Sequence, residues 1–270
     1  MKVSGENPNQ NTVFLSFDIE EFDMPEEYGK VLSFEEQIKI SAEGTKIILD
    51  LLREHKICAT FFSTVAFASH ATELISRIVV EGHELASHGY FHSQFENKHL
   101  LESRVALEKI SGKSVTGFRM ARMMPVEDNA IADAGYLYNS SLNPVYLPGR
   151  YNNFFKPRTV FHKGRLVQIP ASATPIIRLP LFWLSFHNLP QSLYRMACRY
   201  TINTDHYLNI YFHPWEFIDL TQSKFGLPKF VSKNSGTLMI TRFNSWIAWL
   251  KQQHFQFNTL SEFAELQKQK

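Results

Sequence analysis

The sequence has only two cysteines, no long apolar run and little net charge. Cys58 and Cys198 are too few for a disulfide framework, so we expect reduced, buried thiols. No stretch of about 18 apolar residues indicates a membrane span. The 28 Lys or Arg and 26 Asp or Glu leave a formal net charge of +2, which gives no reason to expect a nucleic acid as partner.

An apolar leader is also missing from the first residues. Residues 1–12 are polar, and we interpret them as a flexible N-terminal arm rather than a secretory signal. A cytoplasmic protein is the simplest expectation. No repeat or low-complexity linker divides residues 13–270, which predicts a single catalytic domain. The apolar stretch 176–189 is interpreted as a packed loop, with contact to a lipid surface as the alternative.

Short apolar runs alternate along the chain with longer segments of helical period. Repeated βα units of this kind imply a parallel sheet. Seven or eight such units in 270 residues favour a (β/α) barrel over an open doubly wound sheet. The predicted strands are 13–18, 59–65, 83–88, 115–119, 136–140, 166–170, 208–213 and 255–257, and the predicted helices are 34–55, 71–81, 100–110 and 129–134.

Polar residues stand at the ends of several predicted strands. Asp18, His88, Arg119 and His213 each close one of them. Active sites of (β/α) barrels lie at the carboxyl ends of the strands. We therefore expect these four side chains to meet on one face of the barrel.

Two histidines four residues apart can converge on one divalent ion. His88 and His92 have this spacing, and the carboxylate cluster 18–21 lies at the end of another strand. A catalytic zinc site takes three protein ligands and leaves a position open, and two histidines with one carboxylate fit that requirement. The pattern predicts a metal-assisted hydrolase.

Four short segments at the predicted strand ends form a recognisable set. They read Ser-Phe-Asp-Ile-Glu-Glu at 16–21, His-Gly-Tyr-Phe-His at 88–92, Gly-Phe-Arg-Met-Ala at 117–121 and Ile-Tyr-Phe-His-Pro-Trp-Glu at 210–216. The set resembles the polysaccharide deacetylases, the NodB-homology or carbohydrate esterase family four, over residues 13–257. Gly89 stands where that family usually has Ser or Thr, and Ala121 stands where it has Pro. The Asp-x-Glu and His-Pro-Trp-Glu segments look more like its divergent branch, which includes cyclic-amide-cleaving members.

The resemblance implies a NodB-like distorted (β/α) barrel and a divalent metal ion. Its ligands would be Glu20, His88 and His92, and the ion would be zinc, with cobalt, manganese or nickel as alternatives. Alternation along an extended segment puts residue 20 on the side of residue 18, which favours Glu20 over Glu21. Glu21 stays open as the third ligand, and Asp23 is a weaker candidate.

The resemblance also implies an acid and a base. Asp18 would be the general base, oriented by Arg119, and His213 would be the general acid. These roles suit amide hydrolysis, in which a carboxylate takes the proton of the attacking water and an imidazolium protonates the departing amine.

Candidate substrate contacts lie near the same strand ends. The aromatic residues that could form a platform for an apolar sugar face are Tyr90, Phe91, Tyr146, Tyr151 and Trp215. Glu216 either orients His213 or faces solvent. Arg150 belongs to a basic segment, 143–165, which looks like an ordered insertion over the site and could bind an anionic group.

We therefore predict removal of an N-acyl group, typically acetyl, from a sugar or polysaccharide precursor. One alternative is hydrolysis of a cyclic amide or imide. Another is a catalytically inactive module that binds carbohydrate or a protein partner, which the departures at Gly89 and Ala121 keep open. The expected partner is a saccharide, and a homo-oligomer is possible.

Overall fold

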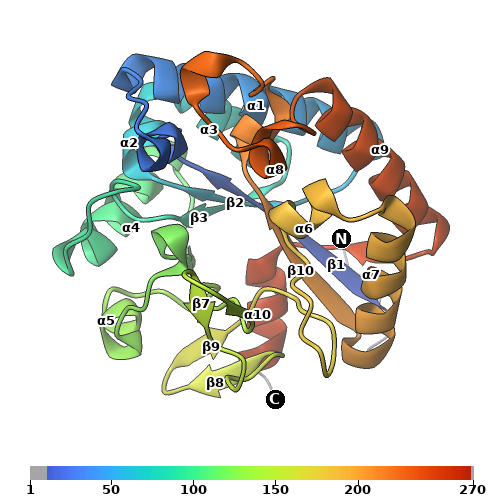
Figure 1. Cartoon of the computed structure of the whole chain (residues 1–270). Coiled ribbons are helices and arrows are strands. Elements are labelled where there is room, and N and C mark those ends of the chain that lie inside the picture. Colours follow the sequence, from blue (N-terminus) through green and yellow to red (C-terminus); the bar gives the residue numbers. More distant parts are fainter. Residues whose placement is uncertain (1–10, 269–270) are drawn as a thin grey trace.

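The computed structural model describes residues 11–268 (Figure 1). Most of the predicted N-terminal arm lies outside these residues, and Thr12, which we assigned to the arm, begins strand β1. None of the helices within the described range combines the length and apolar character needed to cross a membrane.

A curled sheet forms the centre of the fold, in the order β10-β1-β2-β3-β4-β5-β9-β8. The pairings from β10 through β9 are parallel, and β8 runs antiparallel to β9. All eight predicted strands are present. The strands are β1 Thr12–Ile19, β2 Thr60–Ser63, β3 Glu84–Ser87, β4 Gly117–Phe118, β5 Tyr138–Asn139, β8 Phe161–Lys163, β9 Leu166–Gln168, β10 Tyr207–Phe212 and β11 Gln256–Phe257.

Side-chain and backbone hydrogen bonds close the sheet between its β9 and β10 ends. The Ser172 amide donates to the Asn209 carbonyl at 2.8 Å. The Asn209 side-chain amide donates to the carbonyls of Ile169 and Pro170 at 3.2 and 3.0 Å. The sheet is thus a half-barrel completed by a seam rather than by a strand pair, which confirms the predicted distorted (β/α) barrel.

Strand β1 is the most heavily paired element of the sheet. One of its edges pairs with β10, and the other pairs with β11 at residues 12–13 and with β2 at residues 16–19. From Val13 to Ile19 every residue is buried, as expected for a parallel strand covered on both faces. The residues that follow β1 are therefore held in place by three neighbouring strands.

The helices surround this sheet (Figure 1). The predicted helices are present, and α1 has the predicted bounds because Ser33 caps its first turn and Lys56 ends it in the left-handed conformation. Helices α2, α6, α7, α8, α9 and α10 were not predicted. The helices are α1 Phe34–His55, α2 Val65–His70, α3 Thr72–Val80, α4 Lys98–Ser111, α5 Asp128–Asp133, α6 Trp183–Asn188, α7 Gln191–Asp205, α8 Lys229–Ser232, α9 Thr237–Gln252 and α10 Leu260–Lys268.

The apolar stretch 176–189 divides into two parts. Leu181 and Phe186 are fully buried around α6, whereas Ile176 and Ile177 are 82% and 73% exposed. The expected packed loop is therefore wrong for the first two residues of the stretch. It is also wrong for the last part, which is helical.

A glycine in α1 allows the turn after β10 to approach closely. This turn is the short 3₁₀ helix η3, Pro214–Phe217. A Cβ on Gly44 would lie 2.0 Å from the Pro214 carbonyl oxygen, well inside van der Waals contact. Only glycine leaves room for η3 to rest on the helix backbone, and η3 directly follows His213.

Candidate functional site

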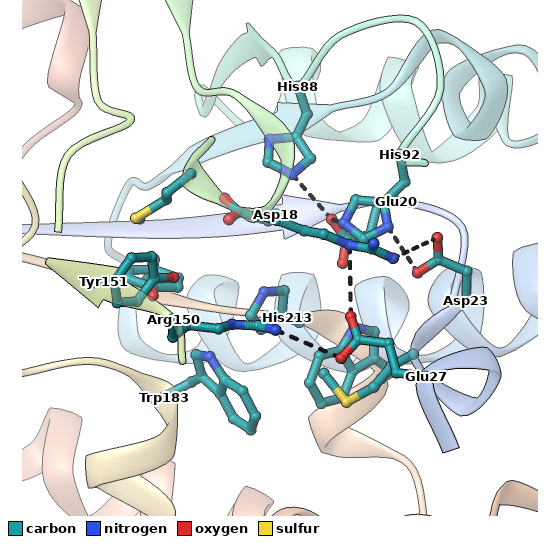
Figure 2. Close-up of a pocket in the computed structure, with 15 residues that line it drawn as sticks. Asp18, Glu20, Asp23, Glu27, His88, His92, Arg150, Tyr151, Trp183 and His213 are labelled. Carbon is teal, nitrogen blue, oxygen red and sulfur yellow. Dashed lines mark hydrogen bonds and ion pairs between the residues drawn. The ribbon is translucent and has the colours of Figure 1, made fainter. Parts of the chain in front are cut away.

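The carboxyl ends of β1, β3 and β10 meet around one cleft (Figure 2). Asp18 and Glu20 reach it from the end of β1, His88 and His92 from the loop after β3, and His213 from the end of β10. In the structure these residues lie together on one face of the sheet, as the sequence predicts. The position at the carboxyl edge follows from the parallel sheet.

Three side chains in the cleft direct ligand atoms at one point. The Nε2 atoms of His88 and His92 lie 3.0 and 3.1 Å from the same oxygen, Oε2 of Glu20. All three residues are at least nine-tenths buried. They form a group that could hold a metal ion, because one ligand atom from each lies within 4.8 Å of the others.

The other ring nitrogens fix the tautomers of both histidines. Nδ1 of His88 donates to the Arg119 carbonyl at 2.9 Å, and Nδ1 of His92 donates to Asp23 Oδ1 at 2.7 Å. With Nδ1 protonated, each neutral imidazole presents a lone pair at Nε2. Metal-binding histidines are commonly held this way by a second shell of acceptors.

Three lone pairs that face one another repel unless a cation, either a proton or a metal ion, lies between them. Glu20 Oε2 is buried and lacks a hydrogen bond among the described residues. Although burial raises the pKa of Glu20, the neighbouring histidines lower it to about 2. For His92, burial acts in the other direction and lowers the pKa. The neighbouring carboxylates of Glu20 and Asp23 outweigh burial and raise the pKa of His92 to about 9. The donor set of two imidazoles and one carboxylate fits a divalent ion such as zinc.

Gly89 makes the turn between the two histidines possible. Its φ of +90° is a conformation that side chains with a Cβ rarely adopt. The sequence left open whether Gly89 weakens the motif. In this chain a glycine is the residue that suits the backbone between His88 and His92.

The two other acidic residues near Glu20 have different partners. Glu21 accepts a hydrogen bond from Thr64 Oγ1 at 2.6 Å and from the His92 amide at 3.3 Å, so its carboxylate is already satisfied. Asp23 holds His92 from behind. The structure thus brings Glu20, and neither of these two, to the point where both Nε2 atoms converge.

Asp18 is held by a buried arginine. Arg119 Nη1 lies 2.6 Å from Asp18 Oδ1 and also donates to Ser16 Oγ at 2.9 Å. The guanidinium is fully buried, and its remaining donors bond to the carbonyl and hydroxyl oxygens of Ser140. These bonds fix one carboxylate oxygen of Asp18, so the other is the one able to accept a proton.

A carboxylate behind His213 orients its ring. Glu216 Oε1 lies 3.0 Å from His213 Nδ1, which leaves Nε2 as the nitrogen able to act on a substrate. Burial lowers the pKa of His213, but the hydrogen bond to Glu216 and the charge of Glu20 raise it above its usual value. The Trp215 ring stacks on His213 at 4.6 Å. Glu216 is fully buried and therefore does not face solvent, so its position agrees with the interpretation that it orients His213.

Glu216 has a second imidazole partner. Its other oxygen lies 2.9 Å from Nε2 of His187, a buried residue of α6. Sequence reasoning missed His187, because it stands in an apolar stretch and is 29 positions from Glu216. Its contact with Glu216 continues the chain of groups that starts at His213.

An ion bridge joins three residues that line the cleft (Figure 2). Glu27 lies 3.5 Å from Arg150 and 3.6 Å from Arg122. Arg150 comes from the hairpin of β6, Tyr146–Leu147, and β7, Tyr151–Asn152, which lies in the predicted insertion. Arg122 is a non-glycine residue at φ 55°, in the left-handed region that residues with a Cβ seldom adopt. Neither Glu27 nor Arg122 was predicted.

Only some of the predicted sugar-stacking residues line the cleft. Trp215 lines the cleft but is almost fully buried. Tyr90 does not line it, and its ring packs on Phe91 and His99 instead. Tyr151, another of the predicted platform residues, lines the cleft, and so does Trp183, which was not predicted.

Comparisons with known proteins find sequence similarity in the first half of the chain. The family model described as polysaccharide deacetylase matches residues 5–135. A chitooligosaccharide deacetylase from Sinorhizobium fredii is 46% identical over 48 residues, which are 18% of this chain and 22% of that protein. The alignment thus spans about a fifth of that curated relative.

Solved structures extend the likeness to nearly the whole fold. A protein described as a polysaccharide deacetylase from Mycobacterium smegmatis has a TM-score of 0.65 at 20% identity, over 97% of this chain and 92% of that one. The allantoinase PuuE has a TM-score of 0.67 at 15% identity, over 96% and 90%. At these identities the likeness concerns the fold.

Proposed function

We propose that this chain, which belongs to the polysaccharide deacetylase family with NodB homology, is a metal-dependent hydrolase that removes an N-acyl group from a sugar or polysaccharide precursor. The observation that carries the proposal is the convergence of Glu20, His88 and His92 in a cleft that also contains Asp18 and His213. A ligand set, a base and an acid together are what metal-assisted amide hydrolysis requires.

A divalent ion held by Glu20, His88 and His92 would supply Lewis acidity to the acyl carbonyl. Asp18 accepts the proton of the attacking water through the oxygen that Arg119 leaves free. His213, in its protonated form, donates from Nε2 to the departing amine. Glu216 stabilises that imidazolium, and the buried position of the pair strengthens the effect.

The first experiment tests turnover and its dependence on metal. We expect the zinc-loaded protein to release acetate from oligomers of N-acetylglucosamine. Treatment with a chelator should abolish the release, and added zinc should restore it. Metal content is measured by elemental analysis on the same samples, so that acetate release can be compared with the amount of bound metal. Full activity in the metal-free protein would contradict the proposal.

A second candidate is hydrolysis of a cyclic amide or imide. The ion bridge between Arg122, Glu27 and Arg150 favours it, because paired side chains that occupy part of the cleft lining suit a small ring better than a polymer. Turnover of ureide or imide rings with no release of acetate from N-acetylated sugars would select this candidate. Failure of the metal-loaded protein on both substrate classes would favour the inactive binding module.

Replacing Glu216 by Gln should move the alkaline limb of the pH profile toward lower pH. The catalytic form of His213 is protonated, so activity falls as pH rises through its pKa. The Glu216 carboxylate raises that pKa against the effect of burial, and a neutral amide should lower it by on the order of one unit. The profile of kcat/KM against pH measures the shift. Glu265, an exposed carboxylate of α10, provides the control Glu265→Gln, and an unmoved limb in Glu216→Gln would refute the assignment.

A further inference from the structure

Charge is strongly segregated along this chain. Residues 134–204 contain eight Lys or Arg and no Asp or Glu, so all 26 acidic residues lie outside this segment. The small net charge of the whole chain conceals this separation. A stretch of this length without one carboxylate presents no repulsion to an anionic surface.

Part of this positive charge is neutralised within the fold. Three of its basic residues pair with carboxylates from other segments: Arg158 with Asp205, Lys163 with Asp128 and Arg165 with Asp133. Within residues 11–268, no carboxylate forms an ion pair with Lys156 or Arg178, and Arg150 reaches Glu27 only at 3.5 Å. The unpaired basic residues of the segment are therefore Lys156 and Arg178 on the loops around 156 and 178 and Arg195 and Arg199 on α7, whose side chains bond to Ser245 and Gln253.

Two isoleucines are held outward at the tip of a short hairpin on these loops. The hairpin follows β9, and it is closed by a bridge between Ala173 and Pro180 and by a bond from the Thr174 amide to the Leu179 carbonyl at 2.9 Å. At its tip Ile176 and Ile177 are 82% and 73% exposed. Ile176 has φ 64°, a conformation that β-branched residues avoid. The backbone thus holds these side chains in water at a conformational cost.

Arg178 joins this hairpin to the segment that carries the neighbouring exposed rings. Its guanidinium donates to the carbonyls of Pro144 and Lys156 at 3.0 and 2.8 Å and lies 5.3 Å from the Phe154 ring centroid. Phe155, next to these contacts, is 96% exposed, and Tyr146 is 60% exposed. We name Tyr146, Phe155, Ile176 and Ile177 the apolar tip cluster.

We propose that the apolar tip cluster docks onto an anionic phospholipid membrane. Apolar loop tips can enter the boundary between headgroups and acyl chains, while flanking Lys and Arg meet the lipid phosphates. Lys156 and Arg178 flank the cluster in this way, and the absence of acidic residues from 134 to 204 removes the groups that anionic lipid would repel. Arg150, on the β6–β7 hairpin, lines the cleft, so docking brings the cleft mouth close to the headgroups.

The test is sedimentation of the whole protein with phosphatidylcholine vesicles that contain or lack phosphatidylglycerol. We expect binding to the anionic vesicles that weakens as salt rises. The triple variant Phe155→Ser, Ile176→Asn, Ile177→Asn should lower the partition coefficient by at least about tenfold, because it removes the inserted apolar surface. Asn tolerates positive φ, so the hairpin should keep its conformation. Lys156→Gln should weaken binding and reduce its dependence on salt.

The matched control is Val31→Ser with Val80→Ser, which changes two valines that are 85% and 81% exposed outside the apolar tip cluster. This control should bind vesicles as the unaltered protein does. Equal loss in the control, equal binding to neutral vesicles, or retention by an acidic polypeptide resin without vesicle binding would overturn the proposal. Because the assay measures no hydrolysis, its outcome is independent of the acetate assay.

Discussion

Replacing Glu20 by Gln should remove the bound divalent ion and, with it, hydrolysis. Glu20 supplies the only carboxylate oxygen that lies within 3.1 Å of both imidazole Nε2 atoms among the described residues. A neutral amide keeps the size of the side chain but loses the negative charge that the ion requires. Loss of a residue that merely supports a ligand typically costs 10–100-fold in metal affinity, so loss of a ligand should cost about 100-fold or more.

The neighbouring residue provides the matched control for this experiment. Glu21 is also buried, but its carboxylate accepts bonds from Thr64 and from the His92 amide. Glu21→Gln should retain the metal, as measured by elemental analysis after dialysis and by zinc titration. Metal loss in Glu21→Gln together with normal content in Glu20→Gln would exchange the roles of the two residues.

Replacing Asp18 by Asn should abolish most of the activity while leaving the metal in place. An amide cannot accept the proton of the attacking water, and removal of a general base costs about 10²–10⁴-fold. We therefore expect kcat to fall by that factor while zinc content stays at that of the unaltered protein. Parallel loss of metal would instead make Asp18 a ligand.

Asp18→Asn also tests how much the ion pair between Arg119 and Asp18 contributes to the stability of the fold. The guanidinium is fully buried, and removing the partner of a buried charge destabilises a protein by about 3–5 kcal/mol. Asp133→Asn removes an exposed partner of Arg165 and should change stability by less than about 1 kcal/mol. Urea unfolding of both variants at the assay temperature separates loss of fold from loss of chemistry. Equal stability in both variants would contradict the strong Arg119 pairing.

The sheet could be predicted because its strands have local signatures. Short apolar runs end in polar residues, and α1 begins at a Ser cap and carries apolar residues at helical spacing. Helix α7 has such a spacing too, with Tyr194, Cys198 and Ile202 buried, but its surface residues include further apolar side chains that obscure the pattern. Helix α6 has six residues, too few for a periodic signal.

The candidate site was predictable where its residues stand beside one another in sequence or close a predicted strand. His88 with His92 and Asp18 with Glu20 are such neighbours, and Arg119 and His213 end predicted strands. Glu27 and His187 reach the site through contacts between distant segments, and no spacing rule connects them to their partners. Tyr90 illustrates the opposite case, because it stands between the two histidines and yet packs away from the cleft.

The pairing of β1 with β10 also means that the sheet and the candidate site cannot be completed until late in the synthesis of the chain. Strands β1, β2 and β3 and the residues Glu20, His88 and His92 that follow them are complete within the first 92 of the 270 residues. His213 arrives only with β10, whose first pair, Thr12 with Tyr207, joins residues far apart in sequence. Until then one edge of β1 is open, and an unpaired edge is a site for association with other chains. A fragment that stops before β10 would therefore contain the three candidate metal ligands but lack His213, the candidate general acid. It would also expose the unpaired edge of β1, which can associate with other chains.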